Sequence, residues 1–135
     1  MLLLRRSRMG KPIIVVDDDS CIGPRCQVSA KNCIHIERDA IIAQSGLIVD
    51  HGYAHEDGTP PICEQGVTEG GRIRLGQGSL TGQRAAIVCT RGDLVLGRNC
   101  VVAANAVVTR SFPPYSVIFG NPARVNKQFD PVKNA

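Results

Sequence analysis

The chain has 135 residues, which fits one domain, since single cores most often hold about 100–150 residues. Aromatic residues make up 4% and Trp is absent, which argues against a nucleic-acid-binding sheet that stacks bases on aromatic side chains. The net charge of +4 permits a small anionic ligand but does not indicate a DNA binder. The excess of 14 Val and 12 Ile over 8 Leu favours strands over helices.

The N-terminal segment, MLLLRRSRMGK, lacks the order of a signal peptide, because its charges follow a short apolar stretch. We expect residues 1–12 to form a tail or a partial cap. No run approaches the roughly 18 apolar residues of a membrane span. The six Cys lack the CxxC spacing of a zinc site, and most stand beside Val, Ile or Ala. We therefore expect reduced thiols that fill the core of a cytoplasmic protein.

A six-residue period is the main structural signal in the chain. Large, mostly β-branched residues recur at Val16, Ile22, Val28 and Ile34; at Ile36, Ile42 and Ile48; at Leu75, Thr81 and Ile87; and at Leu96, Val102 and Val108. Small side chains follow four residues later at Ser20, Cys26, Asn32, Ala40, Gly46, Ser79, Ala85, Cys100 and Ala106. This period fits neither a helix nor hairpins, and it predicts a solenoid with one strand and one corner per hexad.

In such a solenoid three hexads complete a coil, so coil partners are expected about 18 residues apart. The large residue points inward and the small one fills a tighter slot near the corner. Gly or Ala often follows the large residue directly, and we expect it to let the backbone turn.

These patterns divide the chain into a β-helix domain at 13–112 and a C-terminal segment at 113–135. Residues 50–72, DHGYAHEDGTPPICEQGVTEGGR, lack the period and form an excursion loop from the domain. A long loop on a rigid scaffold is a common place for binding and catalytic groups. The C-terminal segment leaves the period through Pro113 and Pro114, and we expect it to cap the last coil.

The stretch LGRNCVVAANAVVTRSFPPYSVIFGNPARV resembles the C-terminal signature of the hexapeptide-repeat acyltransferases. The excursion, from DH to EQGVTEGG, resembles their sugar O-acetyltransferase branch, which includes galactoside, maltose and polysaccharide acetyltransferases. The resemblance implies an all-β fold, the left-handed parallel β-helix, and a homotrimer with active sites between subunits. It also implies transfer of an acetyl group from acetyl-CoA to a hydroxyl of a sugar or polysaccharide precursor, without a metal.

The resemblance assigns the general base to His51, whose imidazole can accept a hydroxyl proton at neutral pH without a covalent intermediate. Asp50 and Tyr53 are expected to bind the acceptor. Tyr53 and His55 depart from the family's usual D-H-x-H-aromatic pattern, so His55 is the reserve base. Asn32 lies near the expected acceptor cleft, but as a small-slot residue it is also expected to stack its amide inside the coil.

The coenzyme site implied by the resemblance lies on the later coils. The backbone N–H of Gln83, next to Gly82, is expected to bind the oxyanion, and Ala104 the pantetheine arm. The remaining expected contacts are Thr109 and Arg110 at the nucleotide end and Arg124 near the phosphates. Leu80 stands where relatives often have Trp.

Two other functions remain open at this point. A zinc enzyme resembling the carbonic anhydrase-like β-helices requires three His ligands from neighbouring coils and subunits, and two of the three His here share one loop. A non-catalytic trimerisation scaffold is favoured by the missing Trp and the altered D-H-x-H pattern. The identity of the acceptor, and transfer to oxygen or to nitrogen, also stay open.

Overall fold

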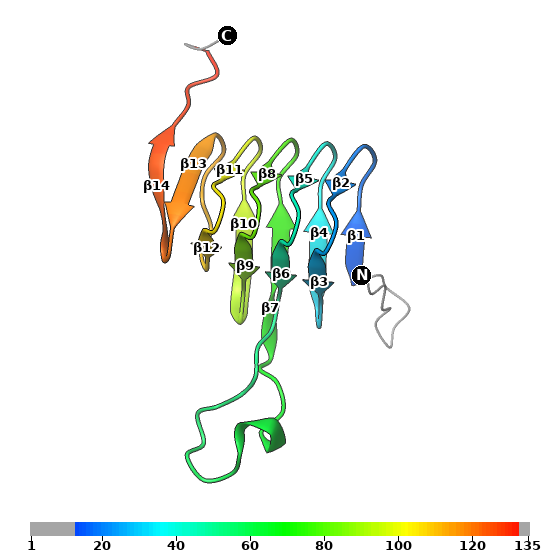
Figure 1. Ribbon diagram of the computed structural model, residues 1–135, viewed down its shortest axis with the longest axis vertical. Helices are drawn as coiled ribbons and strands as arrows, with labels where there is room; N and C mark the ends of the chain where they lie inside the picture. The colour runs from blue at the N-terminus through cyan, green and yellow to red at the C-terminus, as the bar shows by residue number, and fades with distance from the viewer. Residues whose placement is uncertain (1–12, 133–135) are drawn as a thin grey trace.

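The computed structural model describes residues 13–132, so the predicted tail or cap at 1–12 lies outside the described residues. The described chain is almost entirely short strands (Figure 1). In order they are β1 (Ile14–Val16), β2 (Cys21–Ile22), β3 (Gln27–Ser29), β4 (Cys33–Ile36), β5 (Ile41–Ile42), β6 (Leu47–Val49), the 3₁₀ helix η1 (Ile62–Glu64), β7 (Gly70–Leu75), β8 (Leu80–Thr81), β9 (Ala86–Val88), β10 (Arg91–Leu96), β11 (Val101–Val102), β12 (Val107–Val108), β13 (Ser116–Gly120) and β14 (Ala123–Gln128).

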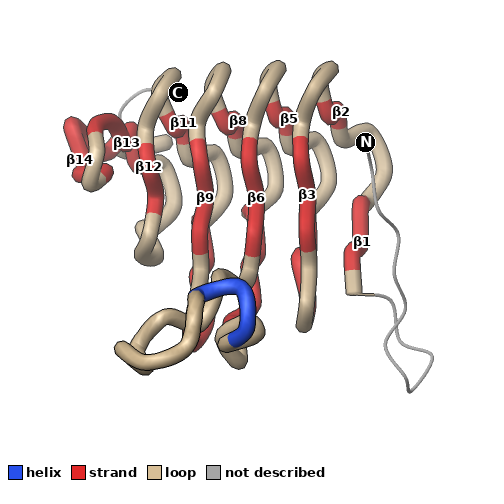
Figure 2. The backbone as a smooth tube through the Cα atoms, turned by 60° about the horizontal axis from the view of Figure 1, so that its bottom comes forward, coloured by secondary structure: helices blue, strands red, loops and turns tan. Residues whose placement is uncertain are grey.

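Successive strands pass around three sheets. Sheet 1 contains β1, β4, β7 and β10; sheet 2 contains β2, β5, β8, β11, β13 and β14; sheet 3 contains β3, β6, β9 and β12. Neighbouring strands are parallel, except for the antiparallel pair β13 and β14. Figures 1 and 2 show the coils side by side, with the excursion projecting from one edge. The six-residue period therefore corresponds to a three-sided parallel β-helix, as predicted.

Inward side chains stack in register from coil to coil and form the core. On sheet 3, Val28, Ile48, Ile87 and Val108 pair in sequence, and each is at most 2% exposed. Val16, predicted to point inward, is 39% exposed because it lies in the first described coil, where no preceding described coil covers it.

Each coil is longer than the three hexads predicted from the sequence. Ile14 pairs with Ile34, and Ile73 pairs with Leu94, so partners lie further apart along the chain than three hexads would place them. The extra residues lie in sheet 1, where Ile34 and Ile36 are both fully buried. The strand on this sheet contributes two inward residues instead of one, which explains the two-residue shift in the period.

The turn at each corner also differs from the prediction. The corner residues with positive φ lie three positions after the large residue and are mostly not glycines; examples are Arg25 (58°) and Arg84 (59°). Gly82 is required for a different reason. A Cβ there would lie 2.6 Å from the carbonyl oxygen of Val102 and 2.8 Å from the nitrogen of Ala104. The small residue therefore allows close approach of the next coil rather than the turn itself.

The coil register is kept across the excursion. Strand β6 ends at Val49 and strand β7 begins at Gly70, and Ile48 pairs with Ile87 although the whole excursion lies between them in sequence. At the other end, Phe112 is buried beside Leu96, and the β13–β14 hairpin extends sheet 2 beyond the last coil. No helix among residues 13–132 is long and apolar enough to cross a membrane.

All six cysteines are free thiols, and three of them fill the core as predicted. Cys26, Cys89 and Cys100 are buried. Burial raises the pKa of the Cys89 and Cys100 thiols above the usual value, because the thiolate would lose its hydration. These side chains therefore act as small apolar fillers.

Replacing Ile48 by Ala tests the stacking of the core. Ile48 is fully buried between Val28 and Ile87, so its truncation leaves a cavity and is expected to lower the free energy of unfolding by about 2–5 kcal/mol. Urea unfolding measures the change. The matched control is Ile62→Ala in the excursion, where the side chain is 47% exposed and the expected loss is below about 1 kcal/mol. Equal losses in the two variants would contradict the assignment of the core.

Candidate active site at the base of the excursion

The excursion starts and ends at the corner where sheet 3 passes into sheet 1. Asp50 directly follows β6, and its carbonyl accepts the N–H of Gly71 in β7 at 2.8 Å. Two residues further out, the N–H of Thr68 donates to the carbonyl of Gly52 at 2.7 Å, and the Thr68 hydroxyl oxygen accepts the N–H of Gly52 at 3.1 Å. The outgoing and returning chains therefore form a two-stranded neck at the base of the loop.

The carboxylate of Asp50 is fully buried beneath this neck. Its Oδ1 accepts the backbone N–H of Lys31 at 2.6 Å, and its Oδ2 accepts those of Asn32 and Cys33, both at 2.9 Å. Three backbone donors thus replace the water that a buried carboxylate would otherwise lose. The carboxylate fastens the corner before β4 to the corner after β6, one coil away.

His51 receives its orientation from the same carboxylate. Its Nδ1 lies 3.0 Å from Asp50 Oδ1, and the side chain is 21% exposed. A neutral imidazole that donates from Nδ1 to a carboxylate carries its free lone pair on Nε2. The arrangement is chemically suited to a general base with a fixed tautomer.

Asp50 is not available for the acceptor binding expected from the sequence, because its carboxylate has no exposed surface and contacts only protein groups. The prediction that Asn32 stacks its amide inside the coil is wrong. Asn32 is exposed, and its Nδ2 donates to the carbonyls of Glu69 at 2.9 Å and Gly71 at 3.1 Å. Asp50 holds the backbone of this segment, which leaves the Asn32 side chain outside the coil against the neck.

Gly70 marks the closest approach of the returning chain to His51. Its φ is +80°, and a Cβ at this position would lie 2.6 Å from the carbonyl oxygen of Asp50 and 2.8 Å from Asn32 Nδ2. Both the backbone conformation and the space exclude a larger residue. The chain therefore returns to the coil in contact with the segment that holds His51.

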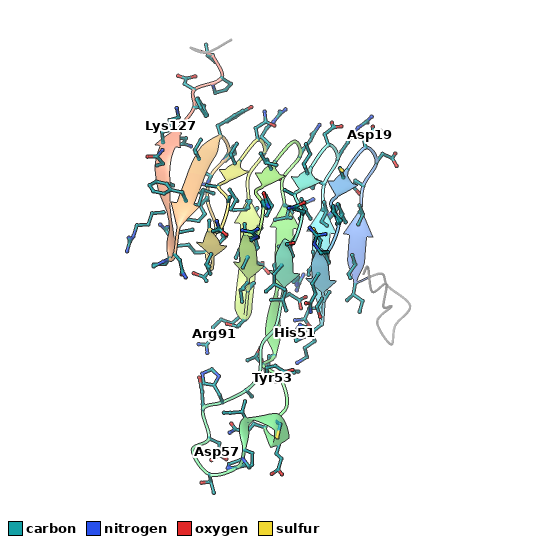
Figure 3. All side chains as sticks on the ribbon, viewed as in Figure 1. Asp19, His51, Tyr53, Asp57, Arg91 and Lys127 are labelled. Carbon is teal, nitrogen blue, oxygen red and sulfur yellow. The ribbon has the colours of Figure 1, made fainter. Side chains whose placement is uncertain are left out.

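Beyond the neck, the excursion and the body enclose a cavity of about 540 Å³. Its polar lining comprises His55, Glu56, Asp57, Gln65 and Thr68 from the excursion and Arg91 from the body. Figure 3 shows Tyr53 and Asp57 along the excursion and Arg91 on the body beside it. Tyr53 is 71% exposed and bridges to Val67, and His55 Nδ1 lies 3.0 Å from the carbonyl of Tyr53. Arg91, Thr68 and Gln65 were missed from the sequence, because their meeting depends on the path of an aperiodic loop.

The expected coenzyme residues fall in three places. Thr109 and Arg110 follow β12 at the sheet 3–sheet 1 corner, the same corner as His51 and two coils further on, which corresponds to about 10 Å. Arg110 lies over the ring of Phe112 at 4.5 Å. Arg124 lies on β14, in the terminal hairpin, and is exposed.

Gly82, Gln83 and Ala104 lie instead at the corner between sheets 2 and 3. The N–H of Gly82 donates to the carbonyl of Val102 at 2.8 Å, whereas no backbone carbonyl of residues 13–132 accepts the N–H of Gln83. A single chain therefore separates His51 from the expected oxyanion donor by the width of sheet 3. Among the described residues, no group of three His, Cys, Asp or Glu side chains is placed to hold a metal ion.

Comparison with known proteins identifies relatives of this chain by sequence, although no family model matches it. The putative lipopolysaccharide biosynthesis O-acetyl transferase WbbJ of Escherichia coli is 26% identical over 130 residues, covering 94% of this chain and 66% of the relative. The probable acetyltransferase Rv3034c of Mycobacterium tuberculosis is 33% identical over 94 residues, covering 70% of this chain and 30% of the relative. The chain thus spans less than two thirds of the length of these relatives.

Solved structures share the fold at lower identity. AntD, an N-acyltransferase from Bacillus cereus in complex with dTDP and coenzyme A, superposes with a TM-score of 0.74 at 17% identity, covering 90% of this chain and 66% of that one. Galactoside acetyltransferase in complex with coenzyme A gives 0.67 at 18% identity, covering 90% and 62%.

The hexapeptide-repeat-containing acetyltransferase VCA0836 from Vibrio cholerae gives a TM-score of 0.65 at 18% identity, covering 87% of this chain and 71% of that one. The fold is the left-handed parallel β-helix expected from the hexads. The resemblance to the hexapeptide-repeat acyltransferases and their sugar O-acetyltransferase branch, predicted from the terminal signature and the excursion, is therefore confirmed in sequence and in fold.

Proposed function

We propose that the protein transfers an acetyl group from acetyl-CoA to a hydroxyl of a sugar or polysaccharide precursor, with His51 as general base and no covalent intermediate. The observation that carries the proposal is the buried carboxylate of Asp50 holding His51 Nδ1 at 3.0 Å. The printed names of the relatives support acetyl transfer, and one of them is an O-acetyl transferase of lipopolysaccharide biosynthesis.

The chemistry follows from the orientation of the imidazole. His51 Nε2 takes the proton of the acceptor hydroxyl as its oxygen attacks the thioester carbonyl. The carbonyl oxygen becomes an oxyanion, for which the unshared backbone N–H of Gln83 is the proposed donor. The C–S bond then breaks, and the thiolate of coenzyme A leaves with the proton from His51. Asp50 stabilises the imidazolium between these two steps and does not touch the substrates.

The acceptor is proposed to bind in the cavity between the excursion and the body. This cavity begins beyond Thr68, whose backbone pairs with Gly52, the residue after His51. Its side-chain amide, carboxylates and guanidinium are the kinds of groups that bind sugar hydroxyls. Tyr53 stays a proposed acceptor contact at the neck, and His55, which lines the cavity, stays the reserve base.

Basic and backbone groups are the proposed contacts for coenzyme A. Thr109 and Arg110 share a corner with His51 and would hold the nucleotide end, and exposed Arg124 would contact a phosphate. Ala104, next to Gln83 on the following coil, would contact the pantetheine arm. The six free thiols and this donor are consistent with a reducing, cytoplasmic location.

A trimer is proposed because the two halves of the site occupy different corners of one chain. The outward residues of sheet 2 form an apolar row in register, made of Cys21, Ile41, Leu80, Val101 and Val117. Leu47, Ala86 and Val107 form a second row on sheet 3. The two rows flank the Gln83 corner, whereas sheet 1 presents polar groups such as His35, Arg72 and Arg74. Packing a neighbour against the apolar rows would place its His51 corner near Gln83 of this chain.

Replacing His51 by Ala is expected to lower acetyl transfer by about 10²–10⁴-fold, because the hydroxyl loses its proton acceptor. Release of coenzyme A thiol from acetyl-CoA, with a panel of methyl glycosides as acceptors, measures the rate. The control is His55→Ala, which is expected to keep most of the activity. Full activity of the His51 variant would refute the proposed base.

Replacing Asp50 by Asn is expected to lower kcat by about 10–10³-fold with little change in the KM for acetyl-CoA. The amide keeps the shape of the carboxylate, but its NH₂ group opposes either the backbone donors or His51 Nδ1. The control, Asp93→Asn, changes an exposed carboxylate on sheet 1. An unchanged kcat in folded Asp50→Asn protein would remove Asp50 from the mechanism.

Replacing Ile41 by Asp is expected to convert a trimer into monomers and to reduce acetyl transfer together with the mass. The side chain is 47% exposed in the isolated chain and lies in the apolar row. Size-exclusion chromatography with light scattering reports the mass. Val95→Asp, on sheet 1, starts from a 40% exposed side chain and should leave the trimer intact. A fully active wild-type monomer would contradict the proposed assembly.

A further inference from the structure

Lys31 and Asn32 lie between the excursion and the carboxylate that holds His51. The Lys31 ammonium donates to the carbonyl of Thr68 at 2.6 Å. The Asn32 amide donates to the carbonyls of Glu69 at 2.9 Å and Gly71 at 3.1 Å. Both side chains therefore bind the returning strand of the neck, on residues that precede and enter β7.

The backbone of the same two residues binds Asp50. The N–H of Lys31 donates to Oδ1 at 2.6 Å and that of Asn32 to Oδ2 at 2.9 Å. Oδ1 is also the oxygen that lies 3.0 Å from His51 Nδ1. One dipeptide thus contacts the neck through its side chains and the orienting carboxylate through its backbone.

The contacts continue to the cavity. Thr68, which accepts the Lys31 ammonium, lines the cavity wall and pairs with Gly52 on the outgoing strand. A continuous set of hydrogen bonds therefore leads from the cavity through Thr68 and Lys31 to Asp50 and His51. Movement of the neck would displace the donors that fix the Asp50 carboxylate.

We infer that Lys31 and Asn32 form a latch, here called the neck latch, that ties the orientation of His51 to the position of the excursion. Both are positioning residues: they act on the base through Asp50 and on the cavity through Thr68. The kinetic consequence rests on the proposed function, whereas the structural consequence does not. Breaking the latch frees the neck and lets the imidazole of His51 sample a second tautomer, with the proton on Nε2.

The direct test is nitrogen NMR of His51 in the protein without substrate, comparing wild type with the double variant Lys31→Met/Asn32→Ala. Wild type is expected to show one tautomer, protonated on Nδ1, and the double variant a mixture of two. Hydrogen exchange of the Thr68 and Gly71 amides should accelerate in the same variant. Lys31→Met alone is the milder variant and should shift the spectrum in the same direction.

Two controls separate the latch from a general effect of substitution. Lys31→Arg keeps a donor toward Thr68 and is expected to restore the single tautomer. Arg98→Met removes an exposed cation at a corner between sheets 1 and 2 and should leave the His51 spectrum unchanged.

Kinetics supply the second readout. The double variant is expected to lose about five- to tenfold in kcat and to raise the KM for a methyl glycoside acceptor, with the KM for acetyl-CoA unchanged. A single His51 tautomer in folded double variant whose neck amides exchange faster would overturn the latch. Failure of wild type to transfer acetyl groups would instead refute the proposed function, and the NMR comparison would still decide on the latch.

Discussion

The requirement that every coil return to the register of the coil before it governs this structure. Inward side chains gain contacts only when they lie over their counterparts, so Ile48 must meet Ile87 even though the excursion separates them in sequence. The buried Asp50 carboxylate meets this requirement at the excursion, because it fastens the corner at residues 31–33 to the next corner. The same carboxylate holds His51. Closure of the coil and orientation of the candidate base therefore depend on one group.

The three-sided scaffold also explains why the site is divided. Residues on one corner are stacked at the coil spacing, so His51, Thr109 and Arg110 share an edge. Gln83 and Ala104 share a different edge, across sheet 3. A rigid β-helix cannot fold one edge onto another, and a second chain is the physically simple way to join them. The apolar rows beside the Gln83 edge provide a surface suited to that contact.

The hexad period predicted the three sheets, the core ladders and the excursion, because stacking constrains every sixth side chain. It could not predict the extra inward residue at Ile36, which depends on strand length in sheet 1. Asn32 fitted the small-residue slot in sequence but lies outside the coil, because the Asp50 carboxylate binds its backbone. Likewise, the burial of Asp50 depends on donors one coil away, and the position of Arg91 on the cavity depends on a loop without a period.

The central claim is that His51, oriented by Asp50, faces the thioester across an interface between chains. A crystal structure of the protein with coenzyme A bound tests it most directly. The account predicts that the sulfur lies between His51 Nε2 of one chain and the backbone N–H of Gln83 of its neighbour, within reach of both through an acetyl group. Coenzyme A whose sulfur lies away from the His51 corner, in a chain that forms no contact through sheets 2 and 3, would contradict it.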